Sequence, residues 1–168
     1  TSPGGARPPP CPGPLTADAV HVVGTRTFSA EVLDFAVDAG LEVAGLLEPF
    51  DRARVGTEVH ELPVSWLDDG PRDGPVAVLL GTGEVDRRET VARLGSAGFQ
   101  LATLIHPGAH VAPSARVEVG VVLGPGVVLG ARSRIGKAVV VGRGSLIGHH
   151  TEIGSLSTLG PGANIAGN

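Results

Sequence analysis

The sequence predicts an α/β unit followed by a parallel β-helix. Alternation of short apolar runs with helix-like segments between residues 20 and 104 predicts the α/β unit. Two further observations predict the β-helix. A branched aliphatic residue occupies every sixth position from residue 105 to residue 165: Ile105, Val111, Val117, Leu123, Leu129, Ile135, Val141, Ile147, Ile153, Leu159 and Ile165. Glycine follows the aliphatic residue at consecutive steps: Gly124, Gly130, Gly136, Gly142, Gly148, Gly154 and Gly160.

The period of six residues excludes an amphipathic helix, whose apolar positions recur every three or four residues. It suits short strands joined by tight corners, with the aliphatic side chain inside and glycine adopting corner dihedrals that a side chain would resist. Successive coils then pair strand on strand about 4.8 Å apart, and backbone polar groups bond to the neighbouring coil. Hexapeptide repeats of this kind are typical of β-helices.

Composition narrows the functional classes. The formal net charge of −4 over 168 residues argues against nucleic-acid binding. The single cysteine excludes an internal disulfide and a cysteine-rich metal site, and it is compatible with a reducing compartment. The sequence contains neither a membrane-spanning apolar run nor the apolar core of a secretory signal. We therefore expect a cytoplasmic protein that contacts neither membrane nor nucleic acid.

The chain is expected to divide into three segments. Residues 1–19 contain six prolines and three glycines and are predicted to form a flexible tail, with a proline-rich docking segment as the alternative. Residues 20–104 form a Rossmann-like domain, in which ligands bind beyond the carboxyl ends of the strands. Residues 105–168 form the β-helix. The expected elements before the repeat are strands at 20–23, 41–47, 61–66 and 75–80 and helices at 29–39 and 84–97.

This order resembles the PglD/NeuD-type sugar acetyltransferases, which are hexapeptide-repeat acyltransferases. The resemblance covers residues 20–168. It is carried by the junction Ile105-His106-Pro107, by Val22-Val23-Gly24, by segments 43–48, 81–88 and 147–154, and by Pro161-Gly162-Ala163 and Ala166-Gly167-Asn168. It implies a left-handed parallel β-helix, a homotrimer, acetyl-CoA bound along the β-helix between subunits, and a sugar nucleotide bound to the N-terminal domain.

The resemblance places His149 at the position of the catalytic histidine, so we expect it to be the general base that takes the acceptor's proton. The family motif Asn-His-Asp/Glu is kept only in part, since Gly148 replaces Asn and His150 replaces the acid. His150 is the second catalytic candidate, but it cannot donate negative charge, so Glu152 or an acid of another subunit would have to support the base.

Two alternatives to catalysis stay open for the histidine pair. One is a pair of exposed corner residues without a role. The other is a metal site assembled from three subunits. Adjacent strand residues point to opposite faces, so one subunit's pair is expected to chelate poorly, and we expect no metal.

The expected acetyl-CoA contacts are Thr158, Gly160 and Gly167. Thr158 stands where the family has a histidine that contacts acetyl-CoA, and its hydroxyl can replace one hydrogen bond. The chain stops within the repeat at Asn168, where the family continues for further coils, so we expect a fragment or a processed chain. His106 and His110 are expected to cap the first coil, and His21 and His60 to be structural.

The first strand-to-helix turn is expected to present backbone N–H groups and a helix N-terminus to a phosphate. It contains Gly24, Thr25 and Arg26 but lacks the several glycines of the family, so side-chain contacts from Thr25 or Arg26 would have to compensate. Glu48 is placed like the acid that holds a ribose hydroxyl, with a solvated strand end as the alternative. Gly81 is expected to line the same crevice.

These observations predict an acetyl-CoA-dependent acyltransferase that acetylates an amino or hydroxyl group of a sugar or nucleotide-sugar. Backbone donors of the β-helix would hold the thioester oxyanion. The alternative is a non-catalytic β-helix assembly or ligand-sensing module, because a fold does not fix a function.

Overall fold

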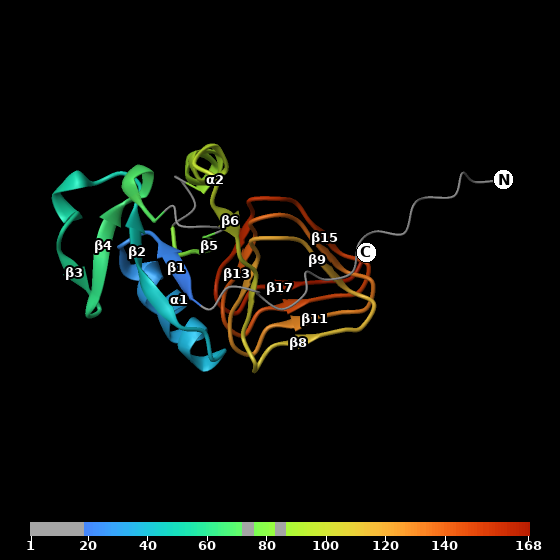
Figure 1. Cartoon of the computed structure of the whole chain (residues 1–168). Coiled ribbons are helices and arrows are strands. Elements are labelled where there is room, and N and C mark those ends of the chain that lie inside the picture. The colour runs from blue at the N-terminus through green and yellow to red at the C-terminus, as the bar shows by residue number, and fades with distance from the viewer. Residues whose placement is uncertain (1–18, 72–75, 83–86) are drawn as a thin grey trace.

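The computed structural model describes residues 19–71, 76–82 and 87–168. An α/β part that ends at residue 101 lies beside a β-helix that begins at residue 104 (Figure 1). All but the last residue of the predicted tail falls outside the described ranges. The elements of the α/β part are β1 (Val20–Val23), α1 (Thr27–Asp38), β2 (Val43–Glu48), β3 (Glu58–Val59), β4 (Leu62–Trp66), β5 (Ala77–Leu80), α2 (Arg87–Ser96) and β6 (Gln100–Leu101), with 3₁₀ turns at Arg52–Arg54 and Leu67–Asp69.

The strands of the α/β part form one six-stranded sheet in the order β3-β4-β2-β1-β5-β6. Neighbouring strands are parallel except β3 and β4, which are antiparallel. Helix α1 makes the crossover between the parallel strands β1 and β2, as a βαβ unit requires. The strand predicted at 61–66 is β4. Its partner β3 has only two residues and was not predicted.

The two helices cover opposite faces of this sheet, because successive strand residues point to opposite sides. Val22 packs in one cluster with Val32 of α1. The next residue, Val23, packs in another cluster with Leu94 of α2. Every residue of β5 is buried, as is typical of a parallel strand covered on both faces.

Helix α1 begins two residues before its predicted start and ends one residue before its predicted end. Apolar periodicity does not define the first turn, which is held by the Ser29 hydroxyl donating to the carbonyl of Arg26 at 2.6 Å. Gly40 stops the helix as predicted, with a φ of 72°. Of the second predicted helix, residues 84–86 lie outside the described ranges, and α2 ends two residues before Gly98.

Two-residue strands build the β-helix as three parallel sheets, which we call the first, second and third face. Partner residues on each face are 18 positions apart, as in the pairs of Leu104 with Val122 and Val122 with Val140. The first face contains β7 (Leu104–Ile105), β10 (Val122–Leu123), β13 (Val140–Val141) and β16 (Thr158–Leu159); the second β8 (His110–Val111), β11 (Val128–Leu129), β14 (Leu146–Ile147) and β17 (Asn164–Ile165); the third β9 (Arg116–Val117), β12 (Arg134–Ile135) and β15 (Glu152–Ile153).

The column of aliphatic residues lies inside the β-helix, as predicted. Its central members pack in a single cluster of buried side chains, with Leu123 and Leu129 fully buried and Ile135 1% exposed. The members near the two ends, such as Ile105 and Ile165, are partly buried against the same cluster. The repeat therefore encodes one continuous core.

The predicted reason for the repeated glycine is wrong. Positive φ angles occur two residues later, as at Gly126, Arg132 and His150, and not at the glycines that follow the aliphatic residues. A Cβ at Gly136 would lie 2.6 Å from the backbone nitrogen of Ser155, which belongs to the next coil. Glycine is needed because adjacent coils approach too closely for a side chain.

The outward residues give each face a different chemistry. On the first face, Leu104, Val122 and Val140 are buried in the same cluster as Val22 and α1. The second face carries an exposed apolar pair, and the third face is charged. The exposed pair is Val128 and Leu146, 37% and 46% exposed; the charged residues are Arg116, Arg134 and Glu152.

Polar contacts also join the α/β part to the β-helix. Helix α1 contributes Asp38, whose carboxylate lies 2.9 Å from Nε2 of His106. In the first turn of α2, the buried guanidinium of Arg87 donates to the carbonyl of Ser157 at 3.1 Å and to the hydroxyl of Thr158 at 2.6 Å. Within the described ranges, no helix has the length and apolarity needed to cross a membrane.

Candidate functional site

The predicted site residues other than Thr158 and Gly160 gather in two clusters. One lies at the carboxyl ends of β1, β2 and β5, and the other lies at a corner of the β-helix. The first cluster is a pocket lined by all five residues predicted to bind substrate, together with three that follow strands: Gly24, Thr25, Arg26, Glu48, Gly81, Pro49, Phe50 and Thr82.

Glycine is required where these strands end. Gly24 has a φ of 104°, and a Cβ there would lie 3.0 Å from the carbonyl oxygen of Gly81. A Cβ at Gly81 would lie 2.7 Å from a side-chain carbon of Val22. The close approach of β1 and β5 therefore fixes the floor of the pocket.

Glu48 is held by its own neighbours. The hydroxyl of Thr25 donates to one carboxylate oxygen, and the other accepts the N–H groups of Phe50 at 2.8 Å and Asp51 at 3.0 Å. Glu48 is 3% exposed, so the alternative of a solvated strand end is wrong. Its carboxylate supports the loop after β2 and presents that loop to the pocket.

Two contributors to this pocket were missed from the sequence. Phe50 is 38% exposed and lines the opening. Arg54 donates to the carbonyl of Thr25 at 2.9 Å and so fixes the turn before α1. An aromatic residue two positions after the acidic strand end was the available signal for Phe50. Nothing in the local sequence links Arg54 to a turn 29 residues earlier.

Arg26 precedes the first residue of α1 and is exposed. Its side chain does not cap the helix, so the first turn of α1 lies uncapped by a side chain beside the pocket. A helix N-terminus in this position favours a negatively charged group, because its first N–H groups lack partners within the helix.

The second cluster is the corner that joins the second face to the third face. It exposes His149 and His150, whose Nδ1 atoms are 3.0 Å apart and whose rings are at 87° to each other. The prediction that adjacent histidines point to opposite faces is wrong. His150 has a φ of 60° and lies in a corner, where the alternation of a strand does not apply.

The contact between the two rings restricts their protons. One of the two Nδ1 atoms must carry the hydrogen and the other must accept it. When His149 is the donor, its Nε2 keeps a lone pair and can act as a base. A Cβ at Gly167 would lie 2.9 Å from this Nε2, so the glycine leaves room for the ring.

The acid predicted to assist His149 has another partner. Glu152 lies on the third face, with its carboxylate 3.6 Å from Nε of Arg134. Both side chains are largely exposed. The partner of the His149 ring in this structure is His150.

The three residues predicted to contact acetyl-CoA are not brought together within one chain. Thr158 lies on the first face, where its hydroxyl accepts a hydrogen bond from Arg87. Gly160 follows it at an exposed corner, and a Cβ there would meet nothing within 4 Å. Gly167 lies against His149. A groove that includes all three would have to be completed by another molecule.

Of the remaining histidines, His106 and His21 have structural surroundings, whereas His60 and His110 are exposed. His106 accepts the N–H of Gly108 at Nδ1, 2.9 Å away, so its Nε2 carries the proton towards Asp38. His21 is half-buried in β1, and burial lowers its pKa below the usual 6.5. Among the described residues, no group of three or more His, Cys, Asp or Glu side chains could hold a metal ion.

Several solved structures are similar to this chain. One is the perosamine N-acetyltransferase of Caulobacter crescentus, which was solved with CoA and GDP-perosamine as a variant with one histidine changed to asparagine. It is 27% identical to this chain, with a TM-score of 0.79, and the match covers 89% of this chain and 71% of that chain. The alanine variant of this GDP-perosamine enzyme, with the same ligands, is 26% identical, with a TM-score of 0.77 over 87% and 70% of the two chains. The structure has the fold of a β-helix sugar N-acetyltransferase.

A further similar structure is the acetyltransferase domain of PglB from Neisseria gonorrhoeae. It is 24% identical, with a TM-score of 0.76 over 88% of this chain and 73% of that chain, and it supports the fold alone. No protein-family model and no curated protein sequence matches this chain. The parallel sheets and few helices are consistent with a left-handed β-helix acetyltransferase.

Proposed function

We propose that this protein is an acetyl-CoA-dependent acetyltransferase of the PglD/NeuD type that acts on an amino or hydroxyl group of a nucleotide-linked sugar. The main support for this proposal is the similarity of the chain, at 26% and 27% identity, to enzymes solved with CoA and GDP-perosamine. The position of the exposed His149 at a β-helix corner supports the same conclusion.

The pocket at the ends of β1, β2 and β5 is the proposed nucleotide site of a Rossmann-like domain over residues 20–104. The uncapped start of α1, near Arg26, suits a phosphate. Thr25 and Glu48 shape the loop that faces the nucleotide. Phe50 offers an exposed ring on which a base can stack.

Acetyl-CoA would lie along the β-helix of residues 105–168, against Thr158, Gly160 and Gly167. These residues are on different sides of one chain, so the proposed cofactor groove is closed by a second subunit of a homotrimer. The exposed pair Val128 and Leu146 on the second face supplies the apolar contact for such an assembly.

In the proposed reaction, the acceptor nitrogen or oxygen attacks the thioester carbonyl carbon. Nε2 of His149 takes the proton that the attacking atom loses. The carbon–sulfur bond then breaks, and the proton passes to the departing sulfur, which yields the acetylated sugar and CoA thiol. His150 is a positioning residue that accepts the Nδ1 hydrogen of His149 and so keeps the lone pair on Nε2.

The test is release of CoA thiol from acetyl-CoA in the presence of GDP- and UDP-linked amino sugars. We expect His149→Ala to lower kcat/KM by about 10²- to 10⁴-fold, the usual contribution of a general base. His150→Ala should cause a smaller loss, because it orients the base. His60→Ala is the matched control, since His60 is an exposed histidine in the turn between β3 and β4, away from the β-helix.

Full activity of the His149→Ala variant would overturn the assignment of the base. A folded wild-type trimer that neither binds acetyl-CoA by calorimetry nor releases thiol with any acceptor would overturn the enzymatic function and favour the non-catalytic β-helix module.

A further inference from the structure

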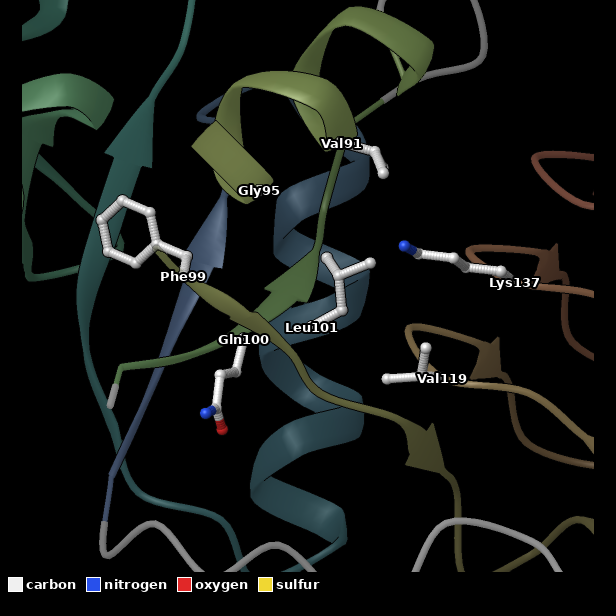
Figure 2. Close-up of a pocket in the computed structure, with 7 residues that line it drawn as sticks. All are labelled: Val91, Gly95, Phe99, Gln100, Leu101, Val119 and Lys137. Atoms are coloured by element: carbon white, nitrogen blue, oxygen red, sulfur yellow. The ribbon is translucent and has the colours of Figure 1, made fainter. Parts of the chain in front are cut away.

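A cavity between α2 and the β-helix belongs to neither cluster described above. Its volume is about 350 Å³, which lies within the size range of small-molecule sites. Junctions between structural units are common positions for such sites. Figure 2 shows the lining residues, which come from both parts of the molecule: Val91, Gly95, Phe99, Gln100, Leu101, Val119 and Lys137.

The walls of this cavity are mainly apolar. Val91 of α2 and Leu101 of β6 point towards the β-helix, and Val119 approaches from the opposite side (Figure 2). Val119 is 40% exposed, so this part of the wall faces water. An apolar body placed among these three side chains would remove them from water.

Lys137, an exposed residue, places one positive charge beside these apolar walls. It is the single lysine of the sequence, and its side chain extends from the β-helix towards Val91 and Leu101 (Figure 2). In the described part of the chain, no carboxylate pairs with its ammonium group, and no acidic residue lines the cavity.

The backbone of Lys137 is fixed at the corner between the third face and the first face. Its N–H donates to the hydroxyl of Ser155 at 3.2 Å, and its carbonyl accepts the N–H of Leu156 at 2.8 Å. The neighbouring N–H of Ala138 donates to the carbonyl of Val119 at 3.0 Å. Successive coils therefore hold the lysine and the apolar wall in register.

We propose that this cavity binds a small organic carboxylate with an apolar body. The carboxylate pairs with the ammonium of Lys137 through a charge-assisted hydrogen bond, and the body packs on Val91, Leu101 and Val119. A neutral analogue lacks the ion pair. A cationic analogue is repelled by Lys137. Charge and shape together thus select the anion.

This ligand would touch α2, β6 and the β-helix at once. Helix α2 begins at Arg87, which binds the carbonyl of Ser157 and the hydroxyl of Thr158. Occupation of the cavity would therefore stabilise the contact between the α/β part and the β-helix, and with it the relative position of the pocket at the strand ends and the His149–His150 corner. A ligand that binds only the folded state also raises the thermal unfolding midpoint.

The experiment uses the full chain and octanoate as the probe, with 1-octanol and octylammonium as neutral and cationic analogues. Methyl NMR spectra recorded while each probe is added show which side chains it contacts. We expect octanoate to shift the methyl resonances of Val91, Leu101 and Val119 and to bind at least about tenfold more tightly than either analogue.

Two substitutions and a control separate the ion pair from general binding. Lys137→Gln should lower the affinity for octanoate at least about tenfold and leave the affinity for 1-octanol unchanged. Lys137→Arg, which keeps the positive charge, should bind octanoate like the wild type. Arg132→Gln removes one positive charge from a different corner and should change nothing. The proposal is overturned if octanoate leaves these methyl resonances unshifted, if 1-octanol binds as tightly, or if Lys137→Gln binds octanoate like the wild type.

Discussion

The α/β part and the β-helix build their cores in different ways. In the α/β part, the central strands β1, β2 and β5 each contribute to two clusters, one under α1 and the other under α2. In the β-helix, one column of aliphatic residues repeats the same contact in every coil. The first core therefore depends on contacts between distant and dissimilar elements, whereas the second depends on neighbours of one kind.

Matched truncations in the two cores should change the unfolding free energy most. Leu46→Ala and Leu129→Ala each remove a fully buried side chain and should each cost about 2–5 kcal/mol of unfolding free energy. Urea unfolding measures the cost. Hydrogen exchange should show opening across the whole sheet for Leu46→Ala, but only in the coils next to β11 for Leu129→Ala.

Val55→Ala is the control for that pair, because Val55 is 37% exposed and belongs to neither core. It should change stability by less than about 0.5 kcal/mol. If both core variants open the same regions to exchange, the contrast between the two cores does not hold.

The next largest effect concerns the joint between the two parts. Arg87→Leu removes the donors to Ser157 and Thr158 from a guanidinium that is 1% exposed, and it should cost about 1.5–3 kcal/mol. Calorimetric unfolding should then separate into two transitions. Arg88→Leu, at an exposed neighbour, should leave a single transition, and a single unshifted transition in Arg87→Leu would contradict this role.

A smaller effect is expected in the nucleotide pocket. Glu48→Gln keeps an acceptor for the N–H groups of Phe50 and Asp51 but loses the charge that receives the Thr25 hydroxyl, at a cost of about 0.5–1.5 kcal/mol. Denaturant titration measures it. Arg26→Gln, an exposed change in the same pocket, should cost less than about 0.5 kcal/mol. Equal stabilities of the two variants would show that Glu48 does not hold the loop.

The smallest effect depends on pH. Burial lowers the pKa of His21 in the folded chain below 6.5, so the unfolded chain binds this proton more readily. The stability that the neutral form of His21 contributes is therefore fully present above about pH 6.5, and it is lost as the pH falls towards the folded pKa. When unfolding free energies are measured from pH 5 to pH 8, the value for His21→Gln should therefore decline less towards acid pH than the value for the wild type. The unfolding free energy of His110→Gln, a change at an exposed histidine, should decline like that of the wild type.

The β-helix could be predicted almost completely, because each coil meets only its neighbours and the rule is visible in every six residues. The column that includes Leu123 and Leu129 was sufficient for this. The reason for the glycines could not be deduced, since a short period is equally compatible with corner dihedrals and with close contact between coils. The need for glycine at position 136 becomes clear only when the position of Ser155 in the next coil is known.

The candidate site was less predictable than the fold. The positions of Gly24, Glu48 and Gly81 at one edge of the sheet follow from the strand order. The bonds that hold Glu48, and the contact of Arg54 with a turn far away in the sequence, depend on how the loop after β2 folds back. The contact between His149 and His150 was missed because strand alternation was applied to a corner.

The pairing of residues 18 positions apart limits how this chain can change in length. An insertion of six residues would preserve the inner aliphatic column but move every later outward residue to the next face. Leu146 and the histidine corner would then rotate away from their present neighbours although the core stayed intact. Only gains or losses of whole eighteen-residue coils keep each side's chemistry in place, so insertions and deletions among relatives are expected in multiples of eighteen.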